Sequence, residues 1–374
     1  MQLFWFSVIA LLWAGFFVLE GFGLGVCALL PIVGRTDARR SAIIQTMAPS
    51  WDGNEGWLLV AGGATFFAFR GWFDGLLSGF TLLFVGVFGA LIVRAIALRA
   101  RAHMSTPRGR QACDAVAFAG SAGTAALLGV VVANFLRGVD LDGHGNVRAG
   151  FGTLFSPYAL LGAAAVLMLF ALLGAVFLGM RTTGPTHRAT RRLVFGLAPL
   201  TGAGVVAFVV WSETMRGGVV SMIFGGLAMG GLAFAISRAL LDQSKRAFGL
   251  LALTTLLLPL WAFSAMWPDV LPARTDPALG LTVHNTAASS GAMIVLTVVG
   301  VELGAVLLVY LTWSYWIFHA RVTGKNAVEP RVRTLAAAPA SNGNGRRSER
   351  AVLTRLVIAP HVRELGRPMS QSEV

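Results

Sequence analysis

The feature that most constrains this chain is a series of long, uninterrupted apolar segments. Each can cross the ~30 Å hydrocarbon core of a bilayer, which takes about 20 helical residues. Inside a bilayer every backbone N–H and C=O must be paired within the spanning element, and the segments lack the alternating pattern of barrel strands, so helices are predicted. We therefore expect an all-α polytopic membrane protein with about nine transmembrane helices, at residues 3–33, 51–69, 75–93, 113–136, 153–180, 193–211, 218–240, 247–267 and 286–318.

The charge content divides the chain into two parts. Only 13% of the 374 residues are charged, whereas soluble domains carry about 25%. Residues 1–322 are predicted to form the transmembrane domain. Residues 323–374 are basic and have too few apolar side chains to fold alone, which predicts a disordered cytoplasmic tail.

The positions of Lys and Arg predict the orientation. One alternating set of connections holds only Arg70, Arg137, Arg148, Arg216 and Arg274, so 25 of the 30 basic residues belong to the other set and the tail. The largest group in that other set is Arg94, Arg99, Arg101, Arg108 and Arg110. Cytoplasmic connections are enriched in basic residues, which places the N-terminus outside and the C-terminus inside. Because the basic residues are spread over these connections, the net charge of +13 does not indicate nucleic-acid binding.

Four acidic residues within or at the ends of the apolar segments are the candidate functional residues. Glu20 lies 13 residues before the inner end of the first segment, about 20 Å deep at 1.5 Å per residue. Asp52 begins the second segment at the cytoplasmic face. A shallow and a deep carboxylate on consecutive helices predict an inward proton path, with Glu55 and Glu302 as weaker candidates. The alternative is that Glu20 is a neutral, hydrogen-bonded packing residue.

No residue pattern predicts a catalytic, metal or haem site within this chain. The six histidines lie in connections, at segment ends or in the tail, and the two cysteines form no C-x-x-C pair. Gly21 and Gly25 form a small-residue face that allows another helix to approach closely.

Several stretches resemble subunit II of cytochrome bd-type quinol oxidases. They are residues 20–25 (EGFGLG), 30–37 (LPIVGRTD), 48–57 (APSWDGNEGW), 285–290 (NTAASS) and 310–316 (YLTWSYW). The W-D-G-N-E-x-W element is the most specific of them, and the resemblance covers residues 1 to about 322.

The resemblance implies nine helices, arranged as two four-helix bundles and one peripheral helix. It implies a larger subunit I that carries two b haems and one d haem, oxidises quinol such as menaquinol, and reduces dioxygen to water. Subunit II of that family is haem-free and inactive alone. It stabilises subunit I, supplies a cytoplasmic proton path that contributes to a proton gradient without pumping, and can hold a structural quinone or lipid. Small single-span accessory subunits, membrane lipids and a bacterial cytoplasmic membrane complete the expectation.

The resemblance also implies roles for particular residues. Asp52 matches the acid of W-D-G-N, and Glu20 matches the first acid of the family's D-G-F-D motif. Gly23 stands where that motif has its second acid, so one carboxylate is absent here. Packing or capping roles are implied for the remaining residues of the tryptophan element, which are Trp51, Gly53, Asn54 and Trp57.

Two other functions fit the membrane acids. A proton-coupled secondary transporter would also use Glu20 and Glu302, although such proteins often contain internal repeats and none is evident here. A purely structural membrane scaffold would have no proton path.

Overall fold

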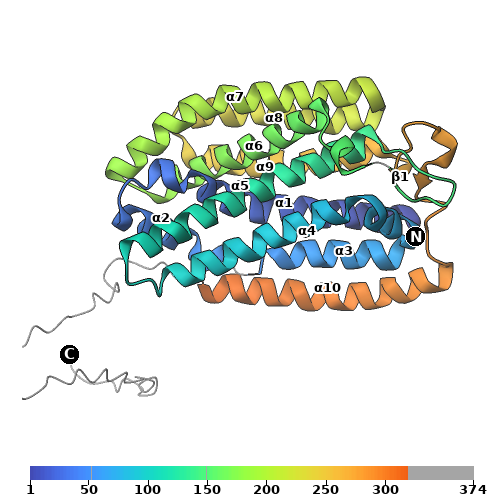
Figure 1. Cartoon of the computed structure of the whole chain (residues 1–374), viewed down its shortest axis with the longest axis horizontal. Coiled ribbons are helices and arrows are strands. Elements are labelled where there is room, and N and C mark those ends of the chain that lie inside the picture. The colour runs from blue at the N-terminus through green and yellow to red at the C-terminus, as the bar shows by residue number, and fades with distance from the viewer. Residues whose placement is uncertain (52, 149, 319–374) are drawn as a thin grey trace, which may run out of the picture. The chain divides into compact units, whose positions relative to one another are not determined.

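The computed structural model describes residues 1–51, 53–148 and 150–318. Its helices run along a shared direction (Figure 1). They are α1 (Gln2–Val33), α2 (Asp37–Trp51), α3 (Glu55–Ala68), α4 (Arg70–Arg101), α5 (Pro107–Arg137), α6 (Pro157–Arg181), α7 (Gly184–Arg216), α8 (Val219–Leu240), α9 (Ser244–Met266) and α10 (Ser290–Phe318). Short 3-10 helices (Phe151–Leu154 and Pro277–Leu279) and an antiparallel pair, β1 (Asp269–Leu271) and β2 (Leu281–Thr282), lie in the connections.

The helices confirm a polytopic, all-helical membrane protein. Among the described residues, α1 and α4 to α9 are long and apolar enough to cross a bilayer. The other two expected segments correspond to α3, which has 14 residues, and to α10, of which Ser290–Glu302 forms a shorter apolar helix. The nine expected segments thus match α1 and α3 to α10, and seven of the nine reach spanning length.

One helix was not expected. Residues 34–50 were predicted to be a connection, but α2 occupies most of it. Ion pairs fasten α2 to its neighbours: Arg40 Nη1 lies 3.1 Å from Asp114 Oδ2 on α5, and Arg101 Nη2 on α4 lies 2.7 Å from Asp37 Oδ1. Because α2 is polar and held by charge, its sequence shows none of the apolar periodicity by which helices are recognised.

The start and end of α4 correct a second expectation. The predicted segment covered residues 75–93, whereas α4 extends from Arg70 to Arg101. Arg94 was therefore placed in a cytoplasmic connection by its charge, but it lies inside the helix with none of its surface exposed.

Helix α1 is the centre of the fold. In the most apolar 18-residue stretch of α1, 78% of the residues are buried, compared with 28% in that of α8. Helix α1 packs against α3, α5, α6 and α9, while α10 packs mainly on α3 (Figure 1). A Cβ at Gly25 of α1 would overlap the Phe170 carbonyl of α6. The two backbones are therefore in direct contact, which only a residue without a side chain allows at that point.

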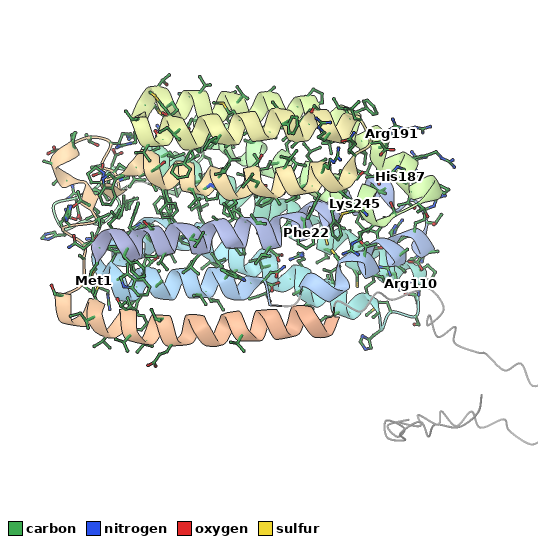
Figure 2. All side chains as sticks on the ribbon, turned by 180° about the vertical axis from the view of Figure 1, so that it is seen from behind. Met1, Phe22, Arg110, His187, Arg191 and Lys245 are labelled. Carbon is green, nitrogen blue, oxygen red and sulfur yellow. The ribbon has the colours of Figure 1, made fainter. Side chains whose placement is uncertain are left out.

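The two ends of the helical body differ in charge. The basic residues Arg110, His187, Arg191 and Lys245 lie at the end opposite Met1 (Figure 2). At the Met1 end, paired acids and arginines hold the long connections together: Asp140 binds Arg274, and Arg216 Nη1 lies 3.4 Å from Asp269 Oδ2.

A buried carboxylate and guanidinium site

The candidate site is centred on an ion pair between helices α1 and α4. Arg94 Nη1 of α4 donates a hydrogen bond to Glu20 Oε1 of α1. Both side chains are completely buried. An isolated charge at this depth would be very costly, so each residue compensates for the burial of the other within the membrane domain.

A second carboxylate approaches the same guanidinium nitrogen. Glu55 is the first residue of α3, and its Oε1 lies 3.9 Å from Arg94 Nη1. Its side chain is 32% exposed, whereas Glu20 has no exposed surface. Arg94 therefore lies between a carboxylate that is open to the surroundings and one that is fully enclosed.

The turn before α3 places Glu55. Gly53 has φ of +98°, a left-handed conformation that glycine adopts without steric cost. Asn54 Nδ2 then donates to the Leu19 carbonyl of α1 at 2.8 Å, next to Glu20 in the chain. Trp57 packs its ring against Gly15, where a Cβ would be 3.0 Å from the ring. These contacts give Gly53, Asn54 and Trp57 a structural role at the junction of α1 and α3.

The structure joins only some of the predicted site residues. Glu20 and Glu55 meet at Arg94. Glu302 is exposed on α10, and among the described residues no ion pair links it to this site. Asp52 lies outside the described residues, and for Trp51 the structure describes the end of α2 but not the side chain.

Several buried polar atoms around the pair have no hydrogen-bond partner within the described part of the chain. They are Glu20 Oε2, Arg94 Nε, Arg94 Nη2 and Ser121 Oγ. Gly23 faces this region, since a Cβ there would lie 3.2 Å from Arg94 Nη2. The position at which the resemblance has a second acid is thus directly beside the guanidinium. Buried polar groups are normally satisfied by protein or by internal water, so the site has the composition of a hydrated cluster.

The sequence analysis missed two charged residues that lie within the spanning helices. Arg94 was overlooked because its charge was counted as a connection signal, although the apolar residues after Val93 continue the helix, and a deep Glu20 requires a cationic partner. Glu213 of α7 was also missed. It accepts hydrogen bonds from Trp261 Nε1 at 2.7 Å and from Ser221 Oγ at 3.1 Å, which joins α7, α8 and α9.

The histidines in the described part of the chain do not fit a haem held by facing helices. His103, His144 and His284 lie in connections, and His187 is in the first turn of α7.

Comparisons with known proteins agree on one family. A sequence profile described as cytochrome bd terminal oxidase subunit II matches residues 1–318. Over 328 residues the chain is 29% identical to cytochrome bd ubiquinol oxidase subunit 2 of Bacillus subtilis (strain 168), covering 86% of this chain and 96% of that protein. Over 380 residues it is 29% identical to cytochrome bd-I ubiquinol oxidase subunit 2 of Escherichia coli (strain K12), covering 88% and 97%.

A solved structure shares the fold. The structure of bd oxidase from Geobacillus thermodenitrificans superposes with a TM-score of 0.61 at 14% identity, covering 86% of this chain and 99% of that chain.

Proposed function

This chain belongs to the cytochrome bd terminal oxidase subunit II family, and on that basis we propose that it stabilises a haem-bearing subunit I and carries protons from the cytoplasm toward the site of dioxygen reduction. The chain is a subunit of an enzyme complex, so activity is expected of the complex and not of this chain alone. The two b haems, the d haem and the quinol site belong to subunit I in this proposal. Family membership does not favour the transporter alternative.

The observation that carries the proton path is the graded exposure of the two carboxylates at Arg94. A proton taken up at Glu55, which is partly exposed, has a short route to Glu20, which is enclosed. Burial favours the neutral form of a carboxylate and a nearby cation favours its charged form, so a buried carboxylate beside a cation can exchange a proton between the two forms. Arg94 supplies that balance to both residues, and the unpartnered polar atoms beside it offer places for internal water.

Asp52 is proposed as the entry to this path. Its place rests on the sequence, because it precedes Glu55 by three residues at the basic end of the second segment. The carboxylate lost at Gly23 is proposed to be replaced in the path by Glu55 and water.

We further propose nine membrane crossings as two four-helix bundles and a peripheral α10, with the N-terminus outside and the C-terminus in the cytoplasm of a bacterium. The gathering of basic side chains at the end opposite Met1 (Figure 2) supports this orientation. Small single-span accessory subunits and membrane lipids are expected as further partners, and a structural quinone or lipid is expected in this subunit.

The exposure of Glu302 supports a position for subunit I against α10. It is exposed on an apolar helix, and an ionisable side chain facing hydrocarbon is costly. Coverage of this face of α10 by subunit I would remove that cost.

The proton path is tested in the assembled oxidase with Glu20→Gln and Asp52→Asn. Gln keeps an oxygen acceptor for Arg94, while Glu55 remains close enough to balance its charge. Oxygen consumption is expected to fall at least about tenfold with unchanged haem absorbance. Asp74→Asn is the matched control, because Asp74 forms an exposed ion pair with Arg70 away from the site. Full turnover in assembled Glu20→Gln would leave only the stabilising role.

A further inference from the structure

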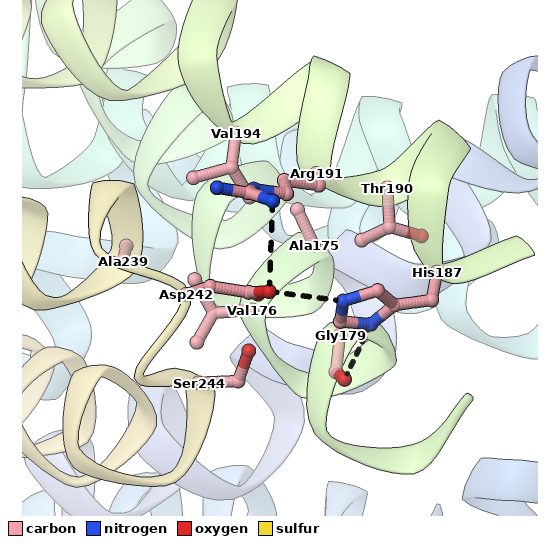
Figure 3. A pocket seen from close by; sticks show the side chains of 10 residues that line it. All are labelled: Ala175, Val176, Gly179, His187, Thr190, Arg191, Val194, Ala239, Asp242 and Ser244. Atoms are coloured by element: carbon pink, nitrogen blue, oxygen red, sulfur yellow. Dashed lines mark hydrogen bonds and ion pairs between the residues drawn. The ribbon is translucent and has the colours of Figure 1, made fainter. Parts of the chain in front are cut away.

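A basic pocket lies at the end of the molecule opposite Met1, and its lining does not include Glu20 or Arg94. It has a volume of about 380 Å³ and is formed where α6 ends, α7 begins and α8 turns into α9. The side chains that line the basic pocket are those of Met180, His187, Asp242, Gln243, Ser244, Lys245 and Arg246. A smaller hollow lined by Thr190, Arg191 and Val194 adjoins it (Figure 3).

Hydrogen bonds preform one wall of this pocket. His187 Nδ1 lies 3.1 Å from the Gly179 carbonyl, and His187 Nε2 lies 3.3 Å from Asp242 Oδ2 (Figure 3). These contacts connect α6, α7 and the turn between α8 and α9. Asp242 has φ of +60°, and this tight turn aims the first residues of α9 into the pocket. The site thus exists without a ligand to organise it.

The balance of charge around the pocket is strongly positive. Asp242 is the one acidic residue among the described residues that line it, and its carboxylate is already engaged by His187 and by Arg191 Nη1 at 3.8 Å. Lys245 and Arg246 line the opening, and neither forms an ion pair within the described residues. Other basic side chains of the same two connections add to the potential: Arg181, Arg188, Arg192 and Arg238.

Exposed apolar side chains continue from the pocket along the helices. Phe195 of α7 is 51% exposed and Phe234 of α8 is 50% exposed. Arg191 lies over the Phe195 ring at 5.8 Å, and Arg238 lies over the Phe234 ring at 4.5 Å. Arginines that rest on aromatic rings at helix ends mark the boundary between hydrocarbon and water. Given the membrane orientation proposed above, the basic pocket is expected to open at the depth of lipid headgroups.

We propose that the basic pocket binds the phosphodiester headgroup of an anionic phospholipid, whose acyl chains lie along Phe195 and Phe234. Lys245 and Arg246 neutralise the phosphate, and the N-terminal amides of α9 add a favourable dipole. Basic pockets between helices on the cytoplasmic side of a membrane are suited to such headgroups. The volume far exceeds the ~30 Å³ share of one water molecule, so it accommodates a headgroup rather than a single solvent molecule.

The test measures lipid retention by the complete oxidase. Wild type and the Lys245→Ala, Arg246→Ala double variant are placed in nanodiscs of phosphatidylglycerol or phosphatidylcholine, and bound lipid is counted by native mass spectrometry after release. Each basic residue contributes about 1 kcal/mol to anionic lipid binding, so affinity for phosphatidylglycerol should fall about 30-fold. Haem absorbance reports that the variant is assembled.

A control variant separates a pocket from general surface charge. The double variant Arg35→Ala, Arg108→Ala removes two exposed basic residues. They lie outside the pocket, at the same end of the molecule as the pocket. Retention of phosphatidylglycerol should be unchanged in this control. An equal loss in both double variants, or equal retention of phosphatidylcholine by wild type, would overturn the proposal.

A free phosphate ion could also supply the negative charge that the basic pocket is suited to bind. Inorganic phosphate should fail to displace the retained phosphatidylglycerol at millimolar concentration, because it lacks the acyl contacts. Displacement by inorganic phosphate would show a soluble-anion site instead and overturn the assignment to lipid. Neither result depends on the proton path.

Discussion

At the scale of single residues, the buried pair of Glu20 and Arg94 links stability to the proposed function. Removing one member of a buried ion pair costs about 3–5 kcal/mol because the other charge is left uncompensated, whereas apolar replacement of both is often neutral. The same pair is proposed to serve proton transfer. Stability and function can therefore be separated at this site.

A double-mutant cycle makes that separation. Glu20→Leu and Arg94→Leu alone are each expected to reduce the amount of assembled oxidase. Arg94→Leu leaves the buried Glu20 without a cation, and Glu20→Leu leaves Arg94 with only the more distant Glu55 carboxylate and without its hydrogen-bond acceptor. The combined variant is expected to recover assembly, measured by haem absorbance in membranes. Its oxygen consumption should nevertheless stay low, since no carboxylate remains at position 20. Recovery of both assembly and turnover would contradict a role for Glu20 in proton transfer.

A residue outside the spanning helices gives a dependence on pH. Hydrogen bonds from the Thr275 hydroxyl and the Arg274 guanidinium hold the pKa of Asp140 below its usual range. A lowered pKa in the folded state stabilises the fold above the ordinary aspartate pKa of about 3.9, and this contribution is lost as pH falls through the folded value. The contact between the two long connections should therefore loosen below about pH 4.

The measurement uses amides at that contact. Val139 N donates to the Pro272 carbonyl at 3.0 Å, and Arg274 N donates to the Val139 carbonyl at 2.9 Å. Hydrogen exchange at these amides, corrected for its intrinsic pH dependence, should increase at acidic pH in wild type. In Asp140→Asn exchange should be faster at neutral pH and nearly independent of acidification. An unchanged wild-type profile at low pH would remove Asp140 as the cause.

At the scale of helices, the crossing of α1 and α6 depends on glycine. Gly25 is in backbone contact with Phe170, and Gly174, one turn further along α6, is in backbone contact with Gly25 as well. Because backbone atoms cannot rotate away as a side chain can, an added methyl group must separate the two helices. This separation would also shift Glu20, which is little more than one turn from Gly25 on α1.

Gly25→Ala is expected to destabilise the subunit by about 3 kcal/mol, near the upper end for overpacking. The measurement is the midpoint of thermal loss of the assembled complex. Gly230→Ala is the matched control, since a Cβ at Gly230 of α8 meets no atom within 4 Å. That variant should be neutral or slightly stabilising. Equal stability of the two variants would show that α1 and α6 are not in backbone contact.

At the scale of the whole molecule, the separation of charge between the two ends is the basis of the proposed orientation. An odd number of crossings puts the two termini on opposite sides, and the basic end belongs in the cytoplasm. Thr275 lies in the connection at the Met1 end, and Ser105 lies in the connection between α4 and α5. Their sides of the membrane should therefore differ.

Cysteine labelling in intact cells tests this topology. A Cys113→Ser background is suitable, because Cys27 is buried and Cys113 is partly exposed. A membrane-impermeant maleimide should label Thr275→Cys in intact cells, but Ser105→Cys only after the membrane is permeabilised. Labelling of both, or the reverse order, would refute the proposed orientation.

The class of the molecule follows from the sequence because it depends on local properties. A long apolar segment must become a helix in a membrane, since its own backbone supplies every hydrogen bond. The glycine face of α1 was also readable as a short motif, whereas α3 begins at Glu55 and not at residue 51, where the second segment was predicted to begin. The resemblance identified the family for the same reason, because its motifs are contiguous in the chain.

What only the tertiary structure decided depends on residues distant in sequence. Glu20 and Arg94 are 74 positions apart, and no local pattern distinguishes an arginine that is buried against an acid from one that ends a helix in the cytoplasm. The polar helix α2 forms because Asp114 and Arg101 hold it. The basic pocket exists because three helix ends converge. Each of these features is set by how helices pack, and packing is determined by contacts between segments rather than by the order of residues within one.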